Sequence, residues 1–296
     1  MKSHSPRLAL ILLASGALVS CVRLADAEAQ IEAQDYESAF SRVALLAKFG
    51  DPQAQNRLGW MLENGLGTNR DPAEAARWYR EAAIRGLATA QNNLGILYRE
   101  GRGVTKDLSE AARWFEKAAA AQHPGGLNNL AVLLDHGEGV PENNSEAAKL
   151  FAMAAEAGNA RAKTNLGVLY KDGEGVPQDL AKARALFEEA SREQDYRGMT
   201  NLGAMLLQGQ GGEANASRAT ELFKAAALGG EPQAAYNLAV TLRASDPREA
   251  YAWVNIAASQ QHQPAVALRE TLKAELSSDD LAAAQARSRE LAKSQG

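Results

Sequence analysis

The sequence predicts an all-helical repeat solenoid. A leucine recurs at intervals of 36 residues without slippage, and the columns of residues beside it repeat as well. Alanine and leucine dominate the apolar residues, whereas the β-branched and aromatic types that favour strands are scarce. Both observations favour helices that stack in register. The recurring leucines are Leu58, Leu94, Leu130, Leu166, Leu202 and Leu238.

The first half of each unit predicts an amphipathic helix. A small residue follows the leucine in every unit, and an asparagine precedes it in five of the six. The small residues let paired helices approach closely. We expect the asparagines, from Asn93 to Asn237, to form a structural ladder that bonds neighbouring backbones; the alternative is that they contact a ligand. In one unit the apolar residues fall at i, i+4, i+7 and i+8, on one helix face: Ala90, Leu94, Leu97 and Tyr98.

The second half of each unit predicts another helix, joined to the first by a Gly-x-Gly turn. Glycine ends the first helix because it adopts the left-handed conformation at little cost. Apolar residues such as Ala111, Trp114 and Phe115 then mark one face of the second helix. An Asp or Asn stands where this helix needs an N-cap. The expected caps are Asp71, Asp107, Asn143, Asp179 and Asn215.

The repeat pattern also predicts the domain boundaries. A lone second-type helix opens the array, and about six units follow within residues 35–260. The last unit starts its second helix at Asp246. It matches the other units only if it has lost five residues before that point. Amphipathic segments at 265–276 and 279–293 predict a helical cap over 261–296. A stack needs such a cap because its last apolar face would otherwise be exposed to water.

Residues 1–20 predict a signal peptide. Basic residues precede an apolar run from Leu8 to Val19, which is too short to span a bilayer as a permanent helix. The run leads into Leu18-Val19-Ser20-Cys21, which is similar to the lipobox of bacterial lipoproteins, whose cysteine is lipidated and becomes the N-terminus. We therefore expect a lipid anchor at Cys21 and a tether over 21–34. Because Val22 rather than Asp follows the cysteine, this resemblance implies the outer membrane.

A second cleavage site leaves an alternative open. Ala25-Asp26-Ala27 is an ordinary small-x-small site, and cleavage there would release a soluble protein. We expect an outer-membrane lipoprotein that faces the periplasm. The alternative is a periplasmic or secreted form.

The repeat columns resemble the Sel-one-like repeat family, a branch of the tetratricopeptide superfamily. The matching features are Asn-Leu-Gly, Leu-Tyr, Gly-x-Gly-Val, and the later Trp-Phe and Ala-Ala pairs, with Gly101 to Val104 and Gly173 to Val176 close to the family pattern. The resemblance covers residues 35 to 260. It implies antiparallel helix pairs stacked into a right-handed superhelix, and a role as an adaptor or scaffold. Fold alone does not fix function.

Charge and motifs exclude several other classes of function. The formal net charge is −4 and no basic run occurs, which argues against nucleic acid as a partner. The single cysteine excludes an internal disulfide. His123, His136 and His262 lie in different units, so we expect no metal and no cofactor. No serine-nucleophile motif is present, so we expect no enzyme; a hydrolase is the minority alternative.

The far side of the first helices is the predicted binding groove for a peptide or protein. On a wheel of about 100° per residue this side lies opposite the buried stripe and combines polar, apolar and charged positions. Its simplest alternative is a solvated face without a partner. The groove residues are Asn92, Ile96 and Arg99 in one unit, then Asn128, Val132 and Asp135, then Thr164, Val168 and Lys171.

Two classes of function remain at this point. The first is a lipid-tethered adaptor that holds another envelope protein or peptide. The second is a soluble periplasmic or secreted effector that acts on peptidoglycan or on host proteins.

Overall fold

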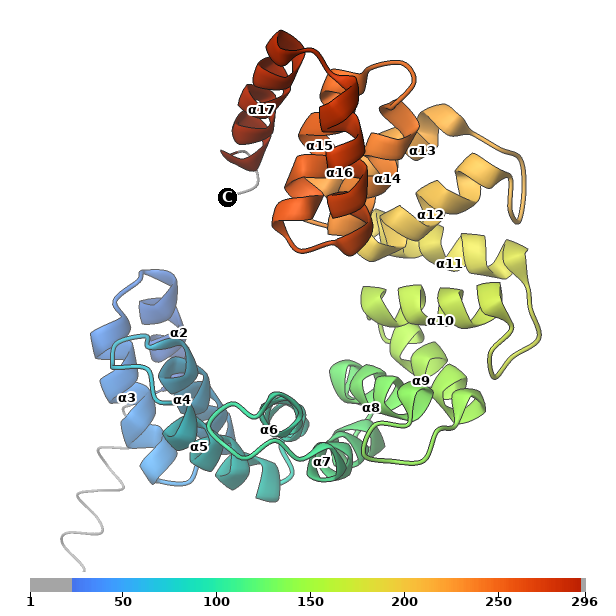
Figure 1. The fold of residues 1–296 in the computed structure, drawn as a ribbon. Coiled ribbons are helices and arrows are strands. Elements are labelled where there is room, and N and C mark those ends of the chain that lie inside the picture. The colour runs from blue at the N-terminus through green and yellow to red at the C-terminus, as the bar shows by residue number, and fades with distance from the viewer. Residues whose placement is uncertain (1–22, 294–296) are drawn as a thin grey trace, which may run out of the picture. The chain divides into compact units, whose positions relative to one another are not determined.

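The computed structural model describes residues 23–293, in which sixteen helices and no strands form. The predicted signal peptide, residues 1–20, and the expected lipid site Cys21 lie outside these residues. The chain divides into two compact units, unit 1 ending at Asn143 and unit 2 beginning at Asn144. The predicted all-α architecture of consecutive helix pairs is confirmed (Figure 1).

Unit 1 is a stack in which each helix packs against the next along the chain. Its helices are α2 (Leu24–Glu32), α3 (Tyr36–Lys48), α4 (Pro52–Asn64), α5 (Pro72–Ile84), α6 (Ala88–Glu100), α7 (Leu108–Ala120) and α8 (Pro124–His136).

Unit 2 repeats this arrangement and ends in the two predicted C-terminal helices. There α15 packs against both α16 and α17, and Figure 1 shows the three side by side. Its helices are α9 (Asn144–Glu156), α10 (Ala160–Asp172), α11 (Leu180–Arg192), α12 (Tyr196–Gln208), α13 (Ala216–Leu228), α14 (Pro232–Leu242), α15 (Pro247–Ser259), α16 (Gln263–Glu275) and α17 (Ser278–Lys293).

Local sequence sets the ends of these helices. The side chain of Asp107 accepts a hydrogen bond from the backbone N–H of Glu110, 2.9 Å away, at the start of α7. Asp71, Asp179 and Asn215 cap α5, α11 and α13 in the same way. At the other end, Gly101 closes α6 with φ of +71°. The predicted caps at these positions are confirmed.

The second glycine of each Gly-x-Gly turn has a separate cause. Gly103 also has a positive φ, and a Cβ there would collide with the carbonyl oxygen of Pro72 in the preceding helix pair. Gly67 stands in the same relation to the carbonyl oxygen of Tyr36. The first glycine therefore ends a helix, and the second lets the turn press against the start of an earlier helix.

Small and aromatic residues fill the space between paired helices. The rings of Phe115, Phe187 and Phe223 are buried, and each lies over the glycine that follows a recurring leucine. Alanines such as Ala82 and Ala118 are fully buried where neighbouring pairs meet. Close approach of helix backbones and large rings together give each unit a continuous core.

The N-terminal end of the array differs from the expectation. Residues 24–32, assigned to a tether over 21–34, form α2, which packs against α3. Ala27 is fully buried in this contact. The helix that begins near residue 35 is therefore not alone, because α2 covers the apolar face that it would otherwise expose to water.

Candidate protein-binding face

The first helices of successive pairs form one surface in each unit, which we call the inner face. Helix α6 contacts α8 in unit 1, while α10 contacts α12 and α12 contacts α14 in unit 2. The second helices α11 and α13 make at most marginal contact with each other. Closer spacing on one side of a stack is what a curved array requires of its inner side. The predicted groove residues all lie on these first helices.

The apolar and charged members of the predicted groove are half-buried. In unit 1 these are Ile96 and Arg99 on α6 and Val132 and Asp135 on α8; in unit 2 they are Val168 and Lys171 on α10. The charged members have local partners. Arg99 pairs with Glu100 at 3.2 Å, Lys171 with Asp172 at 3.4 Å, and Asp135 lies 3.6 Å from His136. The structure therefore places these six positions within reach of a partner.

The polar members of the predicted groove are buried instead. Asn92 and Asn128 each keep 8% of their surface exposed, and Thr164 keeps 1%. The expectation that these three side chains line a groove is wrong. A helical wheel considers one helix and leaves out the neighbouring pair. The polar atoms of Asn92 and Thr164 take part in contacts between helix pairs within their own units.

A ladder of side-chain amides joins the first helices of unit 1. Asn93 Nδ2 donates to Asn56 Oδ1 over 3.1 Å, and Asn129 Nδ2 donates to Asn92 Oδ1 over 2.9 Å. Each bond spans 37 residues and connects consecutive pairs. Arg99 Nη1 also donates to Asn129 Oδ1, over 3.2 Å. The predicted ladder exists here, but it bonds side chains of the preceding pair rather than backbones.

Charged groups extend this closed network in unit 1. The Tyr79 hydroxyl donates to Glu63 Oε2 over 2.9 Å, and Arg102 pairs with the same carboxylate. Burial, with the nearby Glu63 charge, raises the pKa of Tyr79 far above its ordinary value. Tyr79 occupies the column that holds phenylalanine in the next four units, and Glu63 supplies the acceptor that its hydroxyl needs.

The ladder is open between α10, α12 and α14 of unit 2. Thr164 takes the position of Asn92, and its hydroxyl donates to Asp195 at 2.8 Å instead of engaging an amide. Thr200, one repeat later, donates to the backbone oxygen of Tyr196. Within residues 23–293 the side chain of Asn201 consequently has no hydrogen bond, and the amide nitrogen of Asn237 has no acceptor. Both side chains border hollows of the inner face.

Two adjacent hollows lie along α12 in unit 2, and both are bordered by Ala204 and Gln208. The hollow toward α10 is polar, with Asn201 and Lys171 among its lining residues. The hollow toward α14 is mainly apolar, with Leu207 41% and Val240 49% exposed. Large apolar side chains this exposed, beside free amides, form a surface that a partner could cover.

The sequence alone could have indicated this part of the face. Ala204 and Val240 stand one and two repeats beyond Val168, and Leu207 stands one repeat beyond Lys171. The same 36-residue step that located Ile96 and Val132 therefore reaches them. The loss of amide pairing could not be predicted, because it depends on which partner each threonine selects.

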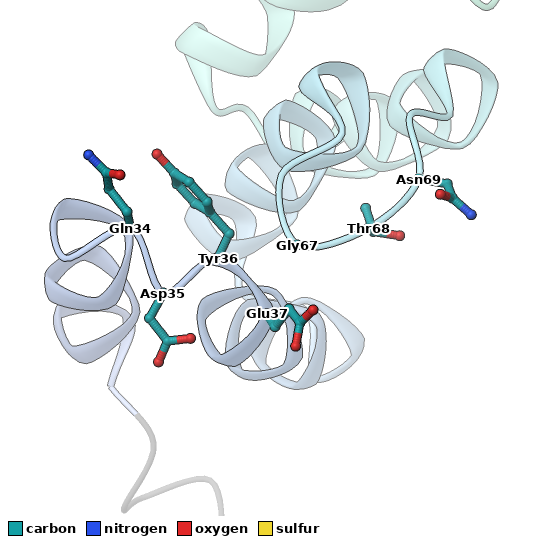
Figure 2. Close-up of a pocket in the computed structure, with 7 residues that line it drawn as sticks. All are labelled: Gln34, Asp35, Tyr36, Glu37, Gly67, Thr68 and Asn69. Atoms are coloured by element: carbon teal, nitrogen blue, oxygen red, sulfur yellow. The ribbon is translucent and has the colours of Figure 1, made fainter.

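Another hollow, in unit 1, lacks the features of a binding site. It lies between the turn after α2 and the turn after α4 (Figure 2). Figure 2 shows Gln34 and Tyr36 pointing to one side and Asp35 and Glu37 to the other, so the side chains diverge. Asp35 already caps α3 by accepting from Ser38 N at 3.4 Å.

Within residues 23–293, no three His, Cys, Asp or Glu side chains converge so that they could hold a metal ion. None of the helices in the same range has both the length and the hydropathy that crossing a bilayer demands.

Comparisons with known proteins agree on the repeat. The Sel1 repeat matches residues 52–87, 88–123, 124–159, 160–195, 197–231 and 232–262. A Sel1 repeat protein from Oxalobacter formigenes is 28% identical, with a TM-score of 0.74 over 79% of this chain and 96% of that one. The c5321 protein, a protective antigen of uropathogenic Escherichia coli strains with an SLR fold, is 26% identical, with a TM-score of 0.69 over 94% of this chain. This chain spans 64% of that protein's length.

Proposed function

The chain belongs to the Sel1 repeat family, and from this premise we propose that it is a non-enzymatic adaptor of the bacterial cell envelope that binds a protein or peptide on its inner face. Proteins of this family are generally interaction scaffolds. The observation that carries the proposal is the exposure of Leu207 and Val240 beside amide side chains on the first helices. Exposed apolar groups rimmed by polar ones are typical of protein-binding surfaces.

Partner binding can be compared between a variant of the inner face and a variant that lies outside it. Membrane extracts are passed over the immobilised chain, over the Val240→Asp variant and over Ile84→Asp, which alters an outer side chain that is 68% exposed. A charge on the inner face should abolish capture of a specific partner, because the carboxylate would be buried without a counter-charge. The Ile84→Asp variant should capture it as the unchanged chain does. Equal capture by all three chains would contradict the proposal.

The envelope location rests on Cys21, and the position of α2 supports it. Cleavage after Ala27 would remove the first residues of α2, including Ala27, which is fully buried, and Asp26, which pairs with Arg42 at 3.1 Å. Processing before Cys21 leaves α2 intact. A lipidated Cys21 would then hold the repeats at the membrane through Val22 and Arg23 alone.

The anchor is tested by fractionation. In the proposed form the chain sediments with outer membranes, and Cys21→Ala moves it to the soluble fraction, because the acyl chains that anchor it are attached to that cysteine. Mass measurement of the mature N-terminus provides the second readout. An unmodified N-terminus in the membrane fraction would overturn the proposal.

The alternative is a soluble periplasmic or secreted effector that acts on peptidoglycan or on host proteins. The likeness to a protective antigen of uropathogenic E. coli supports it, although this chain spans only 64% of that protein. A mature chain that begins at Glu28 and is found in the culture medium would favour this alternative over the lipid-anchored adaptor.

A further inference from the structure

Resting on the proposed function, we infer that the partner is an extended polypeptide segment with a neutral apolar side chain, and that it binds in unit 2 along α12 and α14. Asn201 and Asn237 hold its main chain, and the hollow between Leu207, Tyr236 and Val240 receives its side chain. The inner face of unit 1 does not share this role.

The amides distinguish the two units. In unit 1, the amide nitrogens of Asn93 and Asn129 donate hydrogen bonds to the preceding helix pair. In unit 2, Asn201 and the Asn237 nitrogen make no such bond within residues 23–293, because Thr164 and Thr200 are engaged elsewhere. Asn201 offers both a donor and an acceptor, which is the pair that a peptide group presents, and Asn237 offers a donor, because its oxygen accepts from Gln233. The free amides therefore match a peptide main chain.

An extended segment fits better than a helical one. A helix satisfies its own backbone groups and would leave both asparagine amides unused. Consecutive helices in a stack lie about 8–10 Å apart, and an extended chain in the polyproline II conformation rises about 3.1 Å per residue with three residues per turn. Side chains three residues apart then lie on the same side of the segment, about 9 Å apart, and would reach the two hollows on either side of α12.

The apolar hollow determines which side chain enters it. Its lining combines Leu207, Val240 and the ring of Tyr236 with neutral polar groups, and it carries no charged side chain. A carboxylate or ammonium group there would lose water without gaining a counter-ion. The neighbouring hollow, which holds Lys171 and Asp172 together with amides, accepts a polar residue. The segment is therefore apolar at one position and polar three residues away.

A library of random short peptides displayed on phage, panned against the purified chain, supplies the probe. Selected peptides are synthesised and their dissociation constants are measured by fluorescence anisotropy. Leu207→Asp should weaken binding at least tenfold, and Asn201→Ala with Asn237→Ala should weaken it about tenfold. Ile84→Asp, outside the inner face, is the control that should leave binding unchanged, and Ile96→Asp shows whether the inner face of unit 1 takes part.

Thr200→Asn provides a second variant that keeps every binding residue. The new carboxamide would offer Asn237 the acceptor that Asn92 offers Asn129, so the free amide would be consumed and binding should fall about fivefold. Circular dichroism and melting confirm that each variant folds.

The outcomes separate the inference from the proposed function. Loss of binding in the unit 2 variants alone supports both. Loss with Ile96→Asp, together with retention in the unit 2 variants, overturns the assignment to α12 and α14 but leaves an inner-face adaptor. Selected peptides that carry an acidic residue in place of the apolar one overturn the stated chemistry. No peptide bound by the unchanged chain overturns the inference, and the membrane capture experiment then decides the proposed function.

Discussion

The Cα of Gly95 lies against the ring of Phe115, so closely that a Cβ at position 95 would stand 2.5 Å from a ring carbon. The same relationship joins Gly167 to Phe187 and Gly203 to Phe223, at 2.6 Å in both pairs. In the last unit, Ala239 replaces the glycine and Val254 stands in the aromatic column once the five-residue deletion is counted. The last unit thus combines a methyl group with a smaller side chain, whereas the repeat of Ala131 and Phe151 carries both the methyl group and the ring.

Gly95→Ala should destabilise unit 1. Alanine favours a helix over glycine by about 0.5–1 kcal/mol, but overpacking a core costs about 1–3 kcal/mol. The clash with a fully buried ring prevails, because Phe115 has little room to move. Urea denaturation followed by circular dichroism should show a lower free energy of unfolding.

A double-mutant cycle with Phe115→Val tests the cause. Phe115→Val alone leaves a cavity and should also destabilise the protein. Combined with Gly95→Ala it recreates the Ala239 and Val254 combination, so the loss should fall short of the sum by about 1 kcal/mol. If the two losses in free energy of unfolding simply add, the ring of Phe115 is not the reason that position 95 requires glycine.

The closed part of the ladder in unit 1 and its open part along α12 and α14 predict different responses to an asparagine-to-alanine substitution. Asn129→Ala removes the donor to Asn92, which is almost fully buried, and the acceptor for Arg99. Leaving buried polar atoms unpaired costs about 1–3 kcal/mol. Asn201→Ala should change the free energy of unfolding by less than about 0.5 kcal/mol, because no hydrogen bond is lost within residues 23–293. Chemical denaturation of the two variants compares them directly, and equal losses would refute the open ladder.

Acid should weaken the start of α8 through His123. The Nδ1 atom of His123 accepts a hydrogen bond from Gly126 N at 3.1 Å, which only an unprotonated nitrogen can do. Burial lowers the pKa of His123 below the value of the unfolded chain, about 6.5. The neutral form thus stabilises the fold, so this contribution is complete above pH 6.5 and declines as the pH falls below it. Melting temperatures between neutral and mildly acidic pH measure it.

His123→Asn is the matched control for this pH dependence. Asn159 caps α10 from the equivalent position, so asparagine should preserve the cap at position 123 without titrating. The variant should lose less stability than the unchanged chain over the same decrease in pH. His262, which caps α16 in the same manner, is unchanged in this variant. A pH response identical to that of the unchanged chain would exclude His123 as a source.

The 36-residue repeat made most of the fold predictable. The features that the sequence did not predict lie outside the repeat or depend on how repeats stack. Each helix pair repeats its caps, its glycine turn and its apolar columns, so one unit predicts the others. Helix α2 has only nine residues and carries none of these columns, which is why it was assigned to a tether. The second glycine of each turn was visible, but the backbone of Pro72 that it approaches is set by stacking.

The binding face was predicted in part for the same reason. The wheel placed Ile96 and Val168 on the inner face, because their exposure is a property of a single helix. It misplaced Asn92 and Thr164, because their burial depends on the helix pair beside them. Side chains that act between repeats cannot be located from one repeat alone.

The N-terminal helix supplies the last prediction. A chain that begins at Glu28, as cleavage after Ala27 would leave it, should be less stable than one that begins at Val22. It lacks Leu24 and Ala27, which pack against the core of unit 1, and the five helical residues that remain are too few to hold a helix. We expect a loss of about 2 kcal/mol, the value of burying a side chain the size of leucine.

Hydrogen exchange locates this effect. In the chain that begins at Glu28, the amides of α3 should exchange faster, because α2 no longer covers them. Amides of α12 should serve as the internal reference and stay unchanged. Equal protection of α3 in both chains would show that α2 is dispensable, and cleavage after Ala27 would then be compatible with an intact unit 1.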